Sequence, residues 1–207
     1  MSERPLLPLL GQEPRERSDA ARNRGALVEA AERLIDDCGV DAVTMDALAE
    51  AAGVGKGTVF RRFGSRAGLM AALLDRSEAD WQARVISGPP PLGPGAPPRE
   101  RLVAFGRSRL ETNLKHAALI RAASSVPPTR NYAVYSFAAT HVRYLLDQLD
   151  VSGDIALLAV ALLAPLEVVI LEQQIEIEGM HVERILQGWE ELADRIIARR
   201  RTQRRES

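Results

Sequence analysis

The sequence predicts an all-α protein with a small N-terminal helix-turn-helix domain and a larger C-terminal helical domain. The apolar residues, 46% of 207, are mostly Ala, Leu, Val and Ile, and aromatic residues make up only 4%. This composition suits close-packed helices better than a sheet. Apolar positions also recur at three- and four-residue steps, the period of amphipathic helices, and glycines and capping residues bound these segments.

The N-terminal domain is predicted over residues 18–86, after a disordered arm at residues 1–17. Ser18 or Asp19 can cap its first helix, which Gly39 ends. One face of this helix carries Leu27, Ala31, Leu34, Ile35 and Cys38. Cys38 is the only cysteine, so a disulfide within the chain is excluded, and we expect its side chain to be a small buried apolar group.

Three further helices complete this domain. Thr44 caps the second helix, which Gly53 closes, and a very short third helix spans about residues 56–63. Gly64 stops the third helix, and Ser65 caps the long fourth one. The second helix buries Met45, Leu48, Ala49 and Ala52, and the core between the second and third helices is expected to contain Leu48, Ala52, Val54, Val59 and Phe63.

A Pro- and Gly-rich segment at residues 87–98 interrupts the helical pattern, and it is interpreted as either a loop or a true interdomain linker. The C-terminal domain follows at residues 99–200, and a basic tail at residues 201–207. Its helices are expected over 99–114, 116–125, 132–149, 152–178 (capped by Ser152 and ended by Gly179) and 181–200.

The last two of these helices are unusually apolar. The run at 155–171 is shorter than the ~20 residues that span a bilayer and contains Pro165 and Glu167, so we expect a buried helix and no membrane span. The final helix carries a wide apolar stripe. Together they favour a homodimer built as a four-helix bundle. The predicted dimer contacts are Leu158, Leu162, Val169, Ile170, Gln173, Ile177, Ile185, Trp189, Leu192 and Ile196.

Charge is concentrated in one segment although the whole chain has a net charge of −1. Residues 51–74 contain no acidic residue, yet they include Lys56, Arg61, Arg62 and Arg66. A helix as short as residues 56–63 cannot bury all of its polar side chains. Such an exposed basic helix fits the major groove of B-DNA, which is about 12 Å wide. A solvated basic helix without a ligand is the alternative.

The segment from Thr44 to Met70 combines Thr44, Ala49, Ala52-Gly53-Val54, Lys56-Gly57-Thr58, Val59, Phe60, Phe63 and Arg66. This pattern resembles the DNA-binding domain of the TetR family of transcriptional regulators, and the match spans about Asn23 to Leu74. The resemblance implies a DNA-binding set of Thr44, Lys56, Gly57, Thr58, Phe60, Arg61, Arg62 and Arg66. Within that set, Arg61 and Arg62 correspond to base or backbone contacts. Thr44, Lys56, Thr58 and Arg66 correspond to backbone contacts.

The sequence departs from the family pattern at three places. Phe60 replaces a Tyr whose hydroxyl often bonds a phosphate, so that contact is lost. Gly55 stands where a Ser cap is common, and Ala67-Gly68 replaces an acidic-Ala pair.

The same resemblance implies a ligand-responsive repressor that binds a palindromic operator as a homodimer, with the fourth helix connecting the two domains. An activator of the same fold stays open, as do the operator, the effector and any DNA contact by the arm or tail. Candidate effector contacts in the C-terminal ligand-binding and dimerisation domain are Phe105, Leu110, Tyr132, Tyr135, Phe137, His141, Leu145, Leu162 and Leu166. The alternative for each of them is a plain core residue. His141 with Arg143 or Arg121 could select an acidic ligand, and Pro165 would kink its helix.

Two other classes were weighed against a regulator. A helical enzyme is disfavoured because no histidine has a carboxylate or cysteine at metal-binding spacing, and no phosphate-binding glycine loop or G-x-S-x-G motif occurs. The other class is an interaction adaptor that never contacts DNA. We therefore expect a cytoplasmic protein with no catalytic residue, no metal and no cofactor, whose partners are duplex DNA, a small-molecule effector and a second copy.

Overall fold

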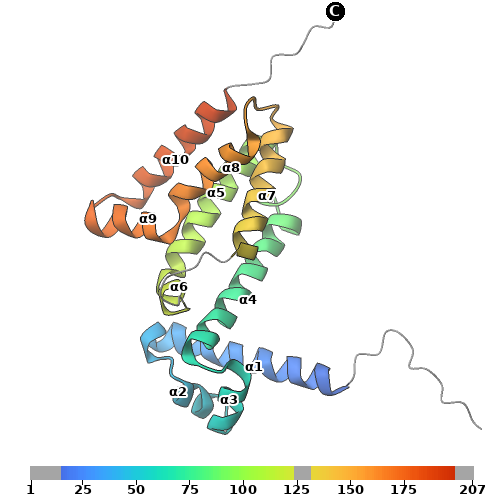
Figure 1. Cartoon of the computed structure of the whole chain (residues 1–207), viewed down its shortest axis with the longest axis vertical. Coiled ribbons are helices and arrows are strands. Elements are labelled where there is room, and N and C mark those ends of the chain that lie inside the picture. Colours follow the sequence, from blue (N-terminus) through green and yellow to red (C-terminus); the bar gives the residue numbers. More distant parts are fainter. Residues whose placement is uncertain (1–14, 124–131, 199–207) are drawn as a thin grey trace, which may run out of the picture. The chain divides into compact units, whose positions relative to one another are not determined.

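The computed structural model describes residues 15–123 and 132–198, and the regular elements in these ranges are all helical (Figure 1). They are α1 (Arg15–Cys38), α2 (Met45–Ala51), α3 (Lys56–Phe63), α4 (Arg66–Ser87), α5 (Pro98–Lys115), α6 (Ala117–Ala123), α7 (Tyr132–Gln148), α8 (Ile155–Leu163), α9 (Val168–Glu172) and α10 (Val182–Ile197), with short 3-10 turns η1 (Val40–Ala42) and η2 (Ala164–Leu166) and a π-helical turn η3 (Gln173–Ile177). The all-α prediction is confirmed. Most of the predicted disordered arm and the basic tail lie outside the described residues.

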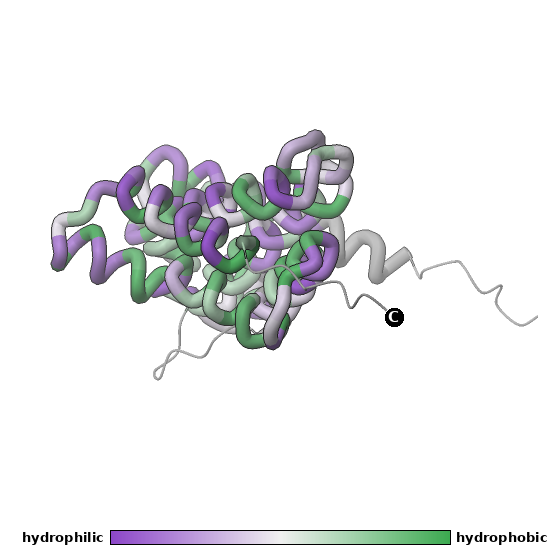
Figure 2. The backbone as a smooth tube through the Cα atoms, turned by 90° about the horizontal axis from the view of Figure 1, so that it is seen from above, coloured by the Kyte–Doolittle hydropathy of each residue, from purple (hydrophilic) through white to green (hydrophobic). Residues whose placement is uncertain are grey.

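The chain divides into two compact units, Met1–Leu73 and Leu74–Ser207. The division falls inside α4, whereas the sequence interpretation placed it in the segment 87–98. That segment belongs to unit 2, because Leu92 packs against the core of that unit. An uninterrupted helix therefore contains residues of both units. Figure 2 shows hydrophobic and hydrophilic residues alternating along the helices, the pattern of helices that bury one face.

Unit 1 packs α1, α2 and α3 around a small core that includes Ala31, Leu48, Val59 and Leu69. Two expectations for α1 are wrong. The helix begins at Arg15 and not at the capping residues Ser18 or Asp19, because nothing in RERSDAAR breaks a helix. Cys38 is exposed, not buried, because it lies in the last turn, beyond the part of α1 that the core covers.

Unit 2 has a larger core, formed where α5, α7, α8 and α10 pack against one another (Figure 1). Trp81 and Val85 of α4 join this core. Trp81 contacts Phe105 and Phe137, with ring centroids 5.1 and 5.9 Å away. The distal part of α4 is therefore an integral part of unit 2.

The single helix predicted over residues 152–178 is broken. Asp154, not Ser152, caps α8, since its Oδ1 accepts hydrogen bonds from the amides of Ala156 and Leu157 at 3.0 and 3.1 Å. Pro165 lacks an amide donor, and Glu167 has extended backbone (φ −70°, ψ 140°). The two halves are bent by 45°. The predicted kink at Pro165 is confirmed, and it ends the helix rather than bending a continuous one.

Two buried side chains satisfy carbonyls at this break. The Trp189 indole donates to the Leu162 carbonyl at 2.7 Å, and the Asn113 amide donates to the Leu166 carbonyl at 2.6 Å. The indole reaches Leu162 by passing over Gly106, where an added Cβ would overlap its ring. Because unpaired buried carbonyls are costly, these two donors stabilise the broken helix.

Among the described residues, no single helix has both the length and the apolar character to cross a membrane; only the bent pair 155–166 and 168–177 passes that test together.

We predict that Gly106→Ala lowers the free energy of unfolding by about 1–3 kcal/mol, because the new methyl group overpacks the site and displaces Trp189. Urea denaturation followed by circular dichroism measures this change. Gly25→Ala is the matched control, since it is also helical and its Cβ would meet nothing within 4 Å. The control should be neutral or stabilising. Equal effects in the two variants would contradict the overlap.

Candidate nucleic-acid interface

The α2–turn–α3 segment is fixed by local hydrogen bonds. Thr44 Oγ1 accepts from the Ala47 amide at 3.0 Å and caps α2, as predicted. The chain then reverses at Gly53, whose φ of 63° is the left-handed conformation that favours glycine. The amide of Val54 closes this turn by donating to the Ala49 carbonyl at 3.0 Å. The predicted bounds of the short helix, residues 56–63, are confirmed.

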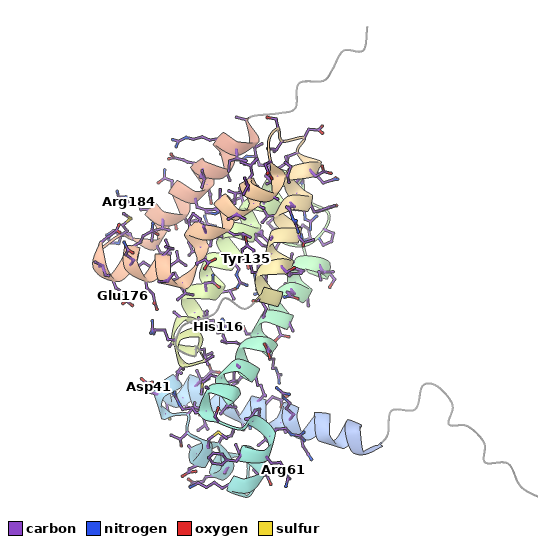
Figure 3. The ribbon with its side chains drawn as sticks, in the orientation of Figure 1. Asp41, Arg61, His116, Tyr135, Glu176 and Arg184 are labelled. Atoms are coloured by element: carbon purple, nitrogen blue, oxygen red, sulfur yellow. The ribbon has the colours of Figure 1, made fainter. Side chains whose placement is uncertain are left out.

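Helix α3 has one buried face and one exposed face. Val59 and Phe63 are buried, as predicted, whereas Val54 in the preceding turn is exposed and so does not belong to the predicted core. Lys56 and Arg61 are exposed, and Figure 3 shows Arg61 extending from α3 away from the body of unit 1. The exposed face of α3 is therefore cationic.

The rest of the predicted DNA-binding set surrounds these cations. Gly57 is exposed, and Phe60 has an exposed fraction of 46%. Thr58 and Arg62 are half-buried beside them. The segment thus places Lys56, Gly57, Thr58, Phe60, Arg61 and Arg62 on one short helix, and their contacts with DNA stay predictions.

An ion pair that the sequence interpretation missed links α2 to α3. Lys56 Nζ lies 2.5 Å from Asp46 Oδ2, and both side chains are well exposed. Asp46 lies in the first turn of α2. An exposed pair of this kind contributes about 1 kcal/mol or less to stability, so it orients Lys56 more than it holds the fold.

Arg66 makes internal contacts that the family resemblance does not imply. Its Nε donates to the Val43 carbonyl at 2.9 Å and its Nη2 to the Val40 carbonyl at 2.7 Å. Arg24 of α1, which the prediction also left out, lies over the Phe63 ring with its guanidinium carbon 5.9 Å from the centroid. No local sequence signal marks either contact, because both join residues far apart in the chain.

The predicted effector contacts in unit 2 fall into two groups. Five are buried in the core: Phe105, Leu110, Leu145, Leu162 and Leu166. Their burial agrees with the alternative that they are plain core residues, and a contact with an effector stays a prediction. Tyr135, Phe137 and His141 are half-buried, and the side chain of Tyr132 lies outside the described residues.

His141 stacks on Phe105 and Phe137, with ring centroids 5.2 and 6.2 Å away. Burial, together with the nearby charge of Arg101, lowers the pKa of His141 to about 4. Its Nε2 and the Nε of Arg101 are both buried without a hydrogen-bond partner.

The cations that the prediction paired with His141 are engaged elsewhere. Arg143 bonds the Ala139 carbonyl and Thr140 within α7, and Arg121 pairs with Glu172. The cation near His141 is instead Arg101, which lies on α5, and α5 packs against α7.

A cavity of about 270 Å³ lies elsewhere in unit 2, between the broken helix and α10. It is lined by Pro165, Gln174, Met180, Arg184, Ile185, Gly188, Trp189 and Leu192. None of the nine predicted effector contacts lines it, because the sequence did not indicate the gap between the two helices.

The predicted dimer contacts also divide. Leu162, Ile185 and Trp189 are buried in the subunit's own core, and a contact with a second copy stays a prediction for them. Ile177 and Val169 are exposed at 81% and 68%, and Ile170 and Gln173 are exposed beside them. Leu158, Leu192 and Ile196 are half-buried. The exposed apolar residues that the prediction missed are Leu157, Val160 and Val182.

The capped helix, the glycine turn and the short cationic second helix define unit 1 as a helix-turn-helix domain of the DNA-binding type. Residues 27–73 match the family described as "Bacterial regulatory proteins, tetR family". The N-terminal domain therefore matches the DNA-binding domain of the TetR family, as the sequence resemblance indicated.

Solved structures show that the likeness of fold extends beyond this domain. A TetR-family transcriptional regulator from Pectobacterium atrosepticum has a TM-score of 0.65 at 19% identity, over 86% of this chain and 93% of that chain. A TetR-like regulator from Rhodococcus sp. RHA1 has a TM-score of 0.53 at 24% identity, over 90% and 99%. A TetR variant from Acinetobacter baumannii AYE, in complex with minocycline, has 0.55 at 21%, over 84% and 93%. No curated protein matches the sequence significantly.

We predict that acidification from pH 7 to pH 5 destabilises unit 2 partly through His141. The pKa of this side chain is lowered in the folded protein, so the unfolded chain binds more protons and stability is lost as the pH falls from about 6.5 towards 4. Discounted for the partial exposure of the ring, the loss is about 1 kcal/mol at pH 5.

Urea denaturation at the two pH values, compared with His141→Phe, measures this loss. The variant should lose less stability than the wild type. Burial also lowers the pKa of His116, so some pH dependence of the same sign should persist. Identical pH dependence in variant and wild type would contradict the assignment.

Proposed function

We propose that the chain is a transcriptional repressor that binds duplex DNA through α3, acts as a homodimer, and releases its operator when a small molecule binds unit 2. The observation that supports DNA binding most directly is the exposed cationic face of α3, held in place by the buried Val59 and Phe63. The proposed role uses no catalytic residue and belongs in the cytoplasm, where the DNA of a bacterial cell lies.

The charge distribution supports a polyanion as the partner, and the dimensions of α3 favour duplex DNA. Net charge over the chain is −1, so long-range attraction to polyanions is weak, and the acid-free segment 51–74 carries the local positive potential. An eight-residue helix is about 12 Å long and fits within the major groove. Arg61 at the exposed surface has the bidentate geometry that reads guanine.

The apolar surface of unit 2 supports a homodimer. Leu157, Val160, Val169, Ile170 and Ile177 are exposed along α8, α9 and η3. Monomeric proteins rarely leave so many large apolar side chains along one bent helix in water. A second copy related by a two-fold axis would cover them and present two α3 helices to a palindromic site.

Contacts of α4 within unit 2 support control by an effector. Arg109 of α5 pairs with Glu78 of α4 at 2.6 Å, both side chains being nearly buried, and it also lies 4.6 Å above the Trp81 ring. A shift of α5 would therefore move the distal part of α4, and α4 continues to Arg66 in the helix-turn-helix domain. The minocycline complex of the Acinetobacter protein is consistent with such an effector, although it shows only what that protein binds.

We predict that Arg61→Ala weakens binding to an operator duplex by about 1–3 kcal/mol if Arg61 reads a base. A duplex selected by the wild-type chain from a random pool provides the probe, and fluorescence anisotropy gives the affinity. Lys115→Ala is the control, since Lys115 is also an exposed cation but lies on α5. Unchanged affinity in the Arg61→Ala, Arg62→Ala double variant would overturn the assignment of α3 as the recognition helix.

We predict that Val169→Glu with Ile177→Glu raises the dimer dissociation constant at least about tenfold, because four carboxylates would be buried at the two-fold interface. Sedimentation velocity measures the constant. Ile86→Glu on α4 is the control for placing a carboxylate at an exposed apolar position. A wild-type chain that sediments as a monomer at micromolar concentration would exclude the proposed dimer.

A further inference from the structure

Arg66 joins two segments of unit 1 that are far apart in the sequence. It is the first residue of α4 and follows the Gly64–Ser65 turn that ends α3. Its guanidinium donates from Nε to the Val43 carbonyl and from Nη2 to the Val40 carbonyl, at 2.9 and 2.7 Å. Both acceptors belong to the connection that precedes α2. The side chain is half-buried, with an exposed fraction of 36%.

We propose that Arg66 is a positioning residue for the recognition helix and not a phosphate ligand. This inference rests on the proposed DNA binding by α3. The Gly53 turn, where the Val54 amide bonds the Ala49 carbonyl, joins the end of α2 to the start of α3. Arg66 links the other two ends, because it follows the end of α3 and bonds the connection that precedes α2. The angle at which α3 is presented depends on both attachments.

The chemistry of the contact requires an arginine. The guanidinium is planar and holds its N–H groups at fixed directions, so one side chain reaches two carbonyls at once. A lysine ammonium at the same position would keep the charge but could not reproduce the fork. Val43 is completely buried, so loss of the donor leaves its carbonyl in a region that water reaches poorly.

A nearby carboxylate also argues against a phosphate-binding role. Asp41 Oδ1 lies 3.8 Å from Arg66 Nη2, so a carboxylate at the exposed surface of unit 1 already balances part of the positive charge. Arg61, in contrast, is exposed at the surface of α3. The two arginines therefore differ in how freely their side chains can approach DNA.

A phosphate contact and a positioning contact predict different affinities and salt slopes for variants of Arg66. If Arg66 bound a phosphate, Arg66→Lys would keep most of the affinity, and Arg66→Gln would reduce the slope of log K against log salt by about 0.9. If Arg66 positions α3, both variants lose preference for the operator. The salt slope then stays at the wild-type value, because the number of phosphate contacts is unchanged.

The test uses the full-length chain and two duplexes, one selected by the wild type from a random pool and one with the same bases scrambled. Affinities are measured at several KCl concentrations, below the melting temperature of each variant. We expect Arg66→Lys and Arg66→Gln each to bind the selected duplex about tenfold more weakly, from the loss of hydrogen bonds by a charged donor. Their affinity for the scrambled duplex and their salt slopes should match the wild type.

Lys56→Gln is the matched control, because the resemblance assigns Lys56 a backbone contact, and it should reduce the salt slope by about 0.9. Wild-type affinity in Arg66→Lys, or a salt slope in Arg66→Gln reduced by about 0.9, overturns the positioning role alone. A wild-type chain that binds no duplex overturns the proposed function itself. The two failures are therefore distinguishable.

A measurement on the wild-type chain covers the case in which the variants fail to fold. With arginine labelled at Nε, the Arg66 Nε–H resonance can be assigned through its proximity to Val43. On addition of the selected duplex, this resonance should keep its shift and its slow exchange with water, whereas the Arg61 resonance should move. A change at Arg66 as large as that at Arg61 overturns the inference.

Discussion

An eight-residue helix is not stable in water by itself, and this limit explains the construction of unit 1. Helix α3 contributes only Val59 and Phe63 to the core, so most of its surface stays free for polar side chains. Its stability must come from its attachments: the glycine turn before it, the core that holds its apolar face, and the Arg66 contacts after it. The rest of the proposed function depends on this helix being held rigidly.

Unit 2 meets a similar constraint at a larger scale. The chain breaks a long apolar helix at Pro165, and a break exposes carbonyls that a continuous helix would pair. Donors from α5 and α10, Asn113 and Trp189, satisfy Leu166 and Leu162. Three helices are thereby joined at one point in the core, and Gly106 is the residue whose small size makes that junction fit.

Much of unit 1 could be predicted because its signals are local. Thr44, Gly53 and Gly64 mark a cap, a turn and a stop within a few residues of the helices that they bound. The contacts that local signals do not carry were missed. Arg66 with Val40 and Val43, and Lys56 with Asp46, depend on how the helices pack, which sequence spacing does not reveal.

Unit 2 shows the limit of periodicity more clearly. The stripe on α10 correctly identified which side chains are apolar, but it could not tell a core partner from a second copy, so Ile185 and Trp189 were placed in an interface and lie in the core. The same ambiguity affected Phe105 and Leu110, which the sequence left as either core residues or ligand contacts and which are buried in the structure. Whether an apolar side chain is buried within the subunit depends on how the helices pack, and this packing is seen only in the structure.

The pair between Asp46 and Lys56 has a consequence for how a chain of this kind would search a genome. In the free protein an intramolecular carboxylate already sits against one of the cations that a backbone phosphate would approach. A passing polyanion has to compete with that carboxylate before it gains the full attraction of the surface, which lowers the residence time on arbitrary sequences. Weak binding to non-specific DNA would then contribute to the discrimination between an operator and the rest of the chromosome.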